Sequence, residues 1–372
     1  MTTTVDETPF YKRVCFYLLS TGLVILLFYV AQEILVPLFF SILLSSLLLP
    51  LNRFLEKVRI PRVLSILLSL VLSLIVIAGI LYFLFDQISG FFEDLPTINE
   101  RLDELSKITQ KWIRETFNVT IRKQNQYMSD TMAKMRASGT NIIGATVVTL
   151  TQALSYLVLL PIYTFLILYY RDRIKRFLID VFNGTKESQV KEILYESQTV
   201  SQSYILGLLI ELMLVFTLNA AGFLILGIKY AVFLALVAAL LNLIPYIGML
   251  VANIFCMVIT LISCEIMQLG DVLWVGIILA VVQFIDNNFL MPMIVGSKVR
   301  INALATIVGV LVGGALCGVP GMFLSIPGLA VLKVIFDRVN GLKPFGMLLG
   351  DDVPVEKAKR TRIKKETTDE KV

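Results

Sequence analysis

Residues 230–263 read YAVFLALVAALLNLIPYIGMLVANIFCMVITLIS, an apolar stretch without a charged residue that is broken once near its centre. The break is the string NLIPYIG at 242–248, whose proline and glycine are unfavourable inside a helix. Each limb has about 16 residues, whereas crossing the hydrocarbon core of a bilayer takes about 20. We therefore expect a helical hairpin here, in which the two limbs enter and leave the membrane on the same side.

A second broken apolar stretch spans residues 302–336, interrupted by the string GVPG at 318–321 and by Pro327 with Gly328. One unbroken apolar run precedes each hairpin, at 204–227 and at 272–292. The two helix–hairpin units enter from opposite faces, which predicts an inverted repeat of the kind found in secondary transporters. Two ordinary helix pairs kinked at proline are the alternative interpretation.

The amino-acid composition is typical of a protein that is embedded mostly in the membrane. Of its 372 residues, 57% are hydrophobic and only 16% charged, compared with about 25% charged in soluble domains. This excludes a soluble globular protein, a disordered chain and a nucleic-acid-binding protein. Histidine is absent from the sequence, so histidine-based metal sites and Ser-His or Cys-His nucleophile pairs are excluded. We expect no cofactor, no metal and no enzymatic activity.

Further apolar runs complete the predicted membrane domain, and they lie at 14–31, 34–51, 63–85 and 145–169. The fold class is therefore all-α, a polytopic membrane protein with about eight membrane segments that include the two broken hairpins. Four parts are predicted: an N-terminal three-helix part (14–85), an amphipathic extramembrane insertion (86–144), a transport core (145–350) and a basic tail (351–372).

The loops indicate the orientation in the membrane. Lys and Arg are abundant at 52–62 and 171–176 and absent from 31–33 and 264–271. Because short cytoplasmic loops are enriched in these cations, the basic loops are predicted to be cytoplasmic. Both chain termini then also lie in the cytoplasm, including the basic stretch at 357–365.

Several polar side chains lie within the predicted spans. A charge at the centre of a membrane helix costs about 2.5–3.5 kcal/mol on insertion scales, so such residues are candidates for function. Two are carboxylates that could carry a proton, and the others are amides that could bind a small polar solute or an ion. The candidates are Glu211, Asn219, Asn242, Gln283, Asp286, Asn287 and Asn288. Hydrogen bonding between helices is the alternative role for the amides.

Spacing groups some of these side chains. Gln283 lies three residues before Asp286 and four before Asn287, so the helical period predicts that they share one face. Glycines at 309, 313, 314 and 318 form two consecutive G-x-x-x-G patterns, which allow close approach of a neighbouring backbone. Close packing is the simpler interpretation, and a face that slides past a scaffold is the other.

Three strings together resemble one family: NLIPYIG at 242–248, QFIDNN at 283–288 running on to Pro292, and the glycine-rich segment from Gly313 to Pro327. The chain is similar to the autoinducer-2 exporter family of bacterial inner-membrane transporters over nearly its whole length. The resemblance implies an eight-segment helical transporter of the inner membrane that forms a homo-oligomer, with a pentamer as one candidate.

The resemblance also assigns roles to residues. It implies a first hairpin tip at Pro245, Tyr246 and Gly248 and a second hairpin at Gly318, Gly321 and Pro327. It implies a polar helix that carries Gln283, Asp286, Asn288 and Pro292. The partners would be the lipid bilayer and a small solute or ion, with no nucleic acid.

The leading hypothesis is therefore export of a small polar organic solute, such as an autoinducer-2-like signal, by alternating access and with proton coupling. The first alternative is a sodium (or lithium)/proton antiporter, because the cluster of carboxylate and amide oxygens at 286–288 could also bind a cation. The second alternative is a membrane scaffold or assembly protein that works through the 86–144 insertion without transport.

Overall fold

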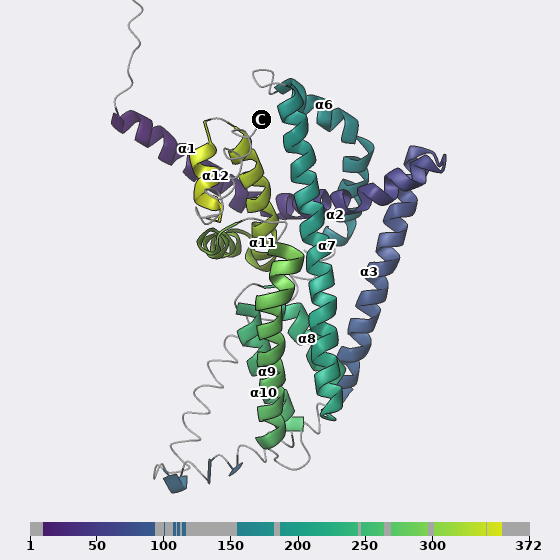
Figure 1. Cartoon of the computed structure of the whole chain (residues 1–372), viewed down its shortest axis with the longest axis vertical. Helices are drawn as coiled ribbons and strands as arrows, with labels where there is room; N and C mark the ends of the chain where they lie inside the picture. The colour runs from purple at the N-terminus through teal and green to yellow at the C-terminus, as the bar shows by residue number, and fades with distance from the viewer. Residues whose placement is uncertain are drawn as a thin grey trace, which may run out of the picture. The chain divides into compact units, whose positions relative to one another are not determined.

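A computed structural model describes residues 10–93, 100, 107–108, 110–111, 114–116, 155–181, 187–244, 247–263, 269–296, 301–339 and 341–351. These residues are almost all helical and include no strand (Figure 1). The helices are α1 (Phe10–Val30), α2 (Gln32–Lys57), α3 (Arg62–Glu93), α6 (Arg171–Val181), α7 (Glu187–Ile225), α8 (Ala231–Asn242), α9 (Ile247–Ser263), α10 (Leu269–Ile285), η1 (Asp286–Leu290), η2 (Pro292–Gly296), α11 (Ala303–Arg338) and α12 (Lys343–Leu349), and a further helix covers Ser155–Tyr169.

Five of these helices are long and apolar enough to cross a membrane: Gln32–Lys57, Arg62–Phe91, Glu187–Ile225, Gly270–Ile294 and Ala303–Arg338. Shorter apolar helices cover Leu18–Val30, Ser155–Tyr169, Ala231–Asn242 and Gly248–Ser263. The predicted fold class, an all-α polytopic membrane protein, is thus confirmed. Most of the predicted 86–144 insertion and all of the tail beyond Asp351 lie outside the described residues.

Helix α7 is longer than the sequence predicts. The predicted apolar run begins at residue 204, whereas the helix begins at Glu187 and has 39 residues. At 1.5 Å per residue such a helix is about 58 Å long, against about 30 Å for the hydrocarbon core. Its polar N-terminal part therefore extends beyond the lipid.

The chain divides into two compact units. One comprises residues 1–46, 170–201 and 299–372, and the other comprises 47–169 and 202–298. Helices α2 and α7 each contribute residues to both units. The candidate polar residues at 211–288 all belong to the second unit.

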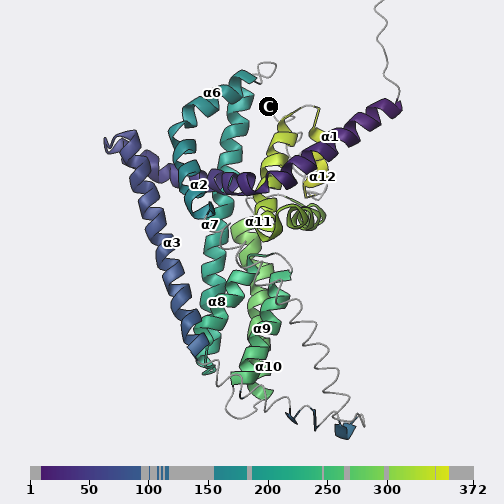
Figure 2. The ribbon, with the colours of Figure 1, turned by 180° about the vertical axis from the view of Figure 1, so that it is seen from behind.

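The first hairpin belongs to that second unit and is formed by α8 and α9, which pack against each other, while α9 also packs against α10. Leu234 and Cys256 are fully buried between the limbs, and the Cys256 thiol donates to the carbonyl oxygen of Leu234 at 3.6 Å. From α3, Phe91 stacks on Phe233 with 4.7 Å between ring centroids. The two views of the ribbon place α8, α9 and α10 beside the C-terminal half of α7 (Figure 2). Bulky apolar side chains hold this hairpin together.

The second hairpin lies in the other unit and consists of α11 folded back on itself. The break falls at Cys317 and Gly318, where Gly318 has φ 63° and ψ −151°, a conformation that is essentially restricted to glycine. The limbs approach so closely that a Cβ on Gly321 would lie 2.1 Å from the carbonyl oxygen of Gly313. The Ser325 hydroxyl donates to the carbonyl oxygen of Gly309 across the limbs at 2.8 Å. The predicted glycine packing is therefore present within one hairpin.

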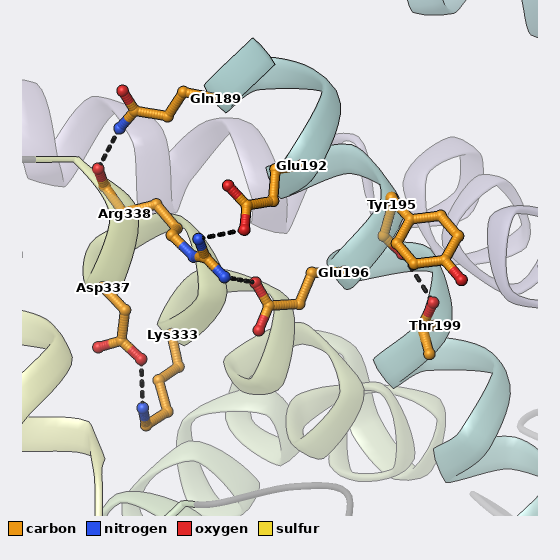
Figure 3. Close-up of polar contacts among 8 residues, drawn as sticks. All are labelled: Gln189, Glu192, Tyr195, Glu196, Thr199, Lys333, Asp337 and Arg338. Atoms are coloured by element: carbon orange, nitrogen blue, oxygen red, sulfur yellow. Dashed lines mark hydrogen bonds and ion pairs between the residues drawn. The ribbon is translucent and has the colours of Figure 1, made fainter.

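The end of this hairpin is tied to the start of α7 by charged side chains (Figure 3). Arg338 contacts the carboxylates of Glu192 at 2.6 Å and Glu196 at 2.8 Å, and the Gln189 amide donates to the carbonyl oxygen of Arg338. These side chains are about one-third to one-half exposed. Each such pair contributes about 0–1 kcal/mol.

Candidate functional site

The packing of α7 against α10 decides which polar residues meet. Val215 of α7, Ala239 of α8 and Val282 of α10 are buried in one apolar cluster. Gly222 of α7 lies against Ile278 of α10, because a Cβ on this glycine would be 2.8 Å from the Ile278 side chain. The two helices therefore run antiparallel. Four residues before Val215 on α7 and four residues after Val282, the side chains of Glu211 and Asp286 come together.

The two carboxyl groups and one amide form a buried cluster. Asp286 is only 3% exposed and Glu211 only 8% exposed. Their carboxyl groups interact directly, side chain to side chain. The Asn242 amide donates to Asp286 Oδ2 at 3.0 Å. The cluster thus joins three helical segments, α7, α8 and η1, whose residues are far apart in the sequence.

One oxygen of this cluster is left without a donor. Asp286 Oδ1 is buried and accepts no hydrogen bond from the described residues. A buried oxygen without a partner costs about 1–3 kcal/mol. A proton shared with the neighbouring carboxyl group of Glu211 would remove this cost, because a carboxylic acid can donate where a carboxylate only accepts.

The helix changes its winding at this position. After Ile285 the backbone forms a π-helix over Asp286–Leu290 and a second one over Pro292–Gly296. Such wide turns are rare and occur frequently at functional sites, because they displace side chains from the regular helical positions. Sequence spacing alone gave no signal for this change.

The remaining amides of the polar string do not join the buried cluster. The Gln283 amide donates to Asn287 Oδ1 at 3.0 Å, as expected for neighbours four residues apart on a helix. Asn288 donates to the carbonyl oxygen of Phe284 at 2.8 Å. Asn287 and Asn288 are exposed, whereas Asp286 is buried. The Gln283–Asn287 pair is thus separate from the carboxyl groups.

Asn219 occupies the same side of α7 as Glu211, eight residues further along. It is 2% exposed, and its amide donates to the carbonyl oxygen of Val215 at 3.0 Å. Its Oδ1 atom is buried without a donor among the described residues. The apolar side chain of Val215 lies between Asn219 and Glu211 along the helix, so the structure brings Asn219 near the cluster but not into it.

The hairpin positions can be placed in part. Pro245 and Tyr246 lie outside the described residues. Gly248 is buried, and a Cβ there would lie 1.7 Å from the carbonyl oxygen of Leu241, so only glycine fits at this end of α9. Pro292 is exposed at the start of η2. The remaining three, Gly318, Gly321 and Pro327, belong to α11 of the other unit, where the helix continues through the buried Pro327.

Tyr204 lies on the same helix as Glu211 of the buried cluster and was not among the candidates from the sequence. It is 3% exposed and lies on α7 seven residues before Glu211, with which it interacts electrostatically. Seven residues are two helical turns, so both side chains share one face. The sequence signal that could have identified it was a tyrosine two turns from a carboxylate within a predicted span.

Among the described residues there is no group of three or more Cys, Asp or Glu side chains that could hold a metal ion.

These features define a class: a multi-pass α-helical membrane protein with ionisable side chains buried between its spans. The family follows from comparison with known proteins. The chain belongs to the AI-2E transporter family, because the sequence model of that family, described as "AI-2E family transporter", matches residues 18–341. It is therefore assigned to the membrane transport proteins.

Individual relatives agree with this assignment. "Putative transport protein YueF" of Bacillus subtilis is 25% identical over 348 residues, which cover 87% of this chain and 93% of the relative. "Putative transport protein YrrI" of the same organism is 28% identical over 320 residues, covering 82% and 86%. "Putative transport protein MT0215" of Mycobacterium tuberculosis is 24% identical over 322 residues, covering 84% and 85%. All three names are those of transport proteins.

Proposed function

We propose that the protein is a secondary transporter of the bacterial inner membrane that exports a small polar solute in exchange for protons. The carboxyl groups of Glu211 and Asp286 are the proton-carrying pair. The observation that carries this proposal is their direct contact, buried between two membrane segments. The family assignment supports the transport function.

The chemistry of the pair follows from its surroundings. Two carboxylates in contact within a low-dielectric environment do not both ionise, because their repulsion is barely screened. The pair therefore holds one proton and one negative charge in its resting state. The Asn242 amide, 3.0 Å from Asp286 Oδ2, stabilises that charge through a charge-assisted hydrogen bond. Uptake of a second proton would neutralise the pair and weaken this bond.

The position of Asn242 connects the charge to movement. It is the last residue of α8, directly before the tip of the first hairpin. The weaker bond to Asp286 would hold the end of α8 less firmly when the pair is neutral. In an alternating-access cycle, this step would couple proton binding to the opening of the hairpin. The exposed amides of Asn287 and Asn288 are then available to the polar groups of a solute.

The test is transport by purified protein in proteoliposomes that contain a pH dye. An imposed proton gradient should dissipate faster when the transported solute is added, with polyols and furanone-like signals as the solutes tried. Asp286→Asn should abolish this acceleration. Asp271→Asn, in the first turn of the same helix α10, is the matched control and should retain it. Proton-coupled transport that persists in Asp286→Asn protein would overturn the proposed role of the pair.

A cation/proton antiporter is the second candidate. The buried oxygen without a donor among the described residues, Asp286 Oδ1, is the observation in its favour, because hard cations bind such oxygens. The same liposomes distinguish the two functions. Dissipation caused by sodium or lithium alone, and lost in Asp286→Asn, would establish the antiporter and exclude the organic exporter.

A further inference from the structure

The side chains around the carboxyl pair differ on its two sides along α7. Toward the N-terminus of the helix, the buried face presents Tyr204 and Gly207. Toward the C-terminus it presents Val215, and Asn219 follows one turn later. One side of Glu211 therefore offers a hydroxyl and a residue without a side chain, and the other side offers an apolar layer.

We infer that, in this conformation, the pair exchanges protons only with the side of the membrane at the N-terminal end of α7. Tyr204 relays the proton, and Val215, Ala239 and Val282 form the barrier on the opposite side. This inference rests on the proposed function of Glu211 and Asp286 as the proton-carrying pair, and it adds the route by which the proton arrives.

The relay follows from the geometry of one helix face. Tyr204 and Glu211 are separated by two turns, about 10 Å along the axis. Side chains in a helix lean toward its N-terminus, so the Glu211 side chain is directed along the face that holds Gly207 and Tyr204. Gly207 places no side chain between them. A phenol hydroxyl can accept one proton while donating another, and water can bridge the remaining distance.

The barrier follows from packing among three helices. Val215, Ala239 and Val282 are 4%, 1% and 6% exposed, and they form one cluster. Apolar side chains of α7, α10 and η1 pack around it: Leu212, Phe216, Ile278 and Leu290. An apolar layer of this density excludes the water that a proton needs to move. The polar side chain of Asn219, which lies beyond this layer along α7, is thus cut off from the pair.

The direction relative to the cell follows from charge. Helix α6 precedes α7 and carries Arg171, Arg173, Lys175 and Arg176. The enrichment of cations in cytoplasmic loops places this end of α7 in the cytoplasm. The described conformation is then open to cytoplasmic protons and closed to external ones.

The test makes the barrier leak and asks whether the leak passes through the relay. Val282→Thr has nearly the shape of valine but adds a hydroxyl to the apolar layer. In proteoliposomes with an internal pH dye and no added solute, it should raise the passive proton flux by roughly tenfold or more, equivalent to lowering the barrier by about 1.4 kcal/mol. Val281→Thr is the matched control: its side chain is half exposed on the same helix, and it should leave the flux unchanged.

The relay is tested in the leaking background. Adding Tyr204→Phe, which keeps the ring but removes the hydroxyl, should return the flux of Val282→Thr close to that of the unmodified protein. Adding Tyr195→Phe should not, because Tyr195 lies on the same helix but is 70% exposed. Size-exclusion profiles and thermal midpoints confirm that each variant is folded.

The outcomes separate the parts of the inference. No leak in folded Val282→Thr protein would overturn the barrier, and a leak that Tyr204→Phe leaves intact would overturn the relay. A leak that Tyr204→Phe removes but Glu211→Gln leaves unchanged would show that protons pass through Tyr204 without using the carboxyl pair. That result would count against the proposed function.

Discussion

The two hairpins have similar sequences in outline, two apolar limbs around a break, but they are held together differently. In the first hairpin, bulky side chains such as Phe233 and Leu234 fill the space between α8 and its neighbours. In the second, the limbs of α11 touch through backbone at Gly313 and Gly321. The first therefore depends on side-chain volume and the second on its absence.

The hairpins also differ in what lies near the break. The last residue of α8, Asn242, is bonded to a buried carboxylate, whereas the break of α11 is a single glycine with positive φ. The proposed coupling thus acts on one hairpin only, and the other is built as a closely packed unit. Two hairpins that are predicted to form an inverted repeat need not have the same function.

The largest expected effect is on the first hairpin. Leu234→Ala should lower the free energy of unfolding by about 2–5 kcal/mol, because the fully buried side chain leaves a cavity between the limbs. Leu250→Ala, at a position 62% exposed in α9, is the control and should change stability by about 0.5 kcal/mol or less. Thermal unfolding in detergent measures both. Equal losses for the two variants would contradict packing by side-chain volume.

The second hairpin should respond to the opposite change. Gly321→Ala adds a methyl group 2.1 Å from the carbonyl oxygen of Gly313, which should cost about 1–3 kcal/mol by overpacking. Gly328→Ala, in the same limb but with nothing within 4 Å, is the matched control. It should leave the thermal midpoint unchanged or raise it slightly, because alanine favours the helix. A stable Gly321→Ala protein would show that the limbs do not need this contact.

A smaller effect is expected from the hydrogen bond across the second hairpin. Ser325→Ala removes a hydroxyl that bonds the carbonyl oxygens of Gly309 and Gly321, and it should cost about 0.5–1.5 kcal/mol. Ser263→Ala in α9 removes only a bond to Ile259 within its own helix, so its thermal midpoint should change less. Equal shifts of the thermal midpoint in the two variants would contradict a stabilising role for the hydrogen bond across the limbs.

The smallest effect is expected at the charged end of α11. Arg338→Gln removes the ion pairs with Glu192 and Glu196, each worth about 0–1 kcal/mol because they are partly exposed. The loss should shrink as salt is added, since salt screens exposed charges. Lys191→Gln, which breaks only the pair with Glu187 one turn away, is the control. A loss of stability that salt does not change would assign Arg338 a packing role instead.

The amino-acid sequence by itself determined that this chain is a helical membrane protein with two broken hairpins. Hydropathy and the positions of proline and glycine are local properties, and the lipid solvent leaves few alternatives to a helix. It also singled out Glu211, Asn242 and Asp286 as candidates for function, because polar side chains are costly in a span. The contact between Gln283 and Asn287 followed from helical spacing.

Only the tertiary structure decided which of the polar residues meet. Glu211, Asn242 and Asp286 lie 31, 44 and 75 residues apart in pairs, and no local period relates such positions. Their meeting depends on how α7 and α8 pack against α10 and η1, which is set by side chains such as Val215 and Val282. The same packing buried Asp286 while leaving Asn287 and Asn288 exposed. Residue type determined the candidates, and helix packing selected among them.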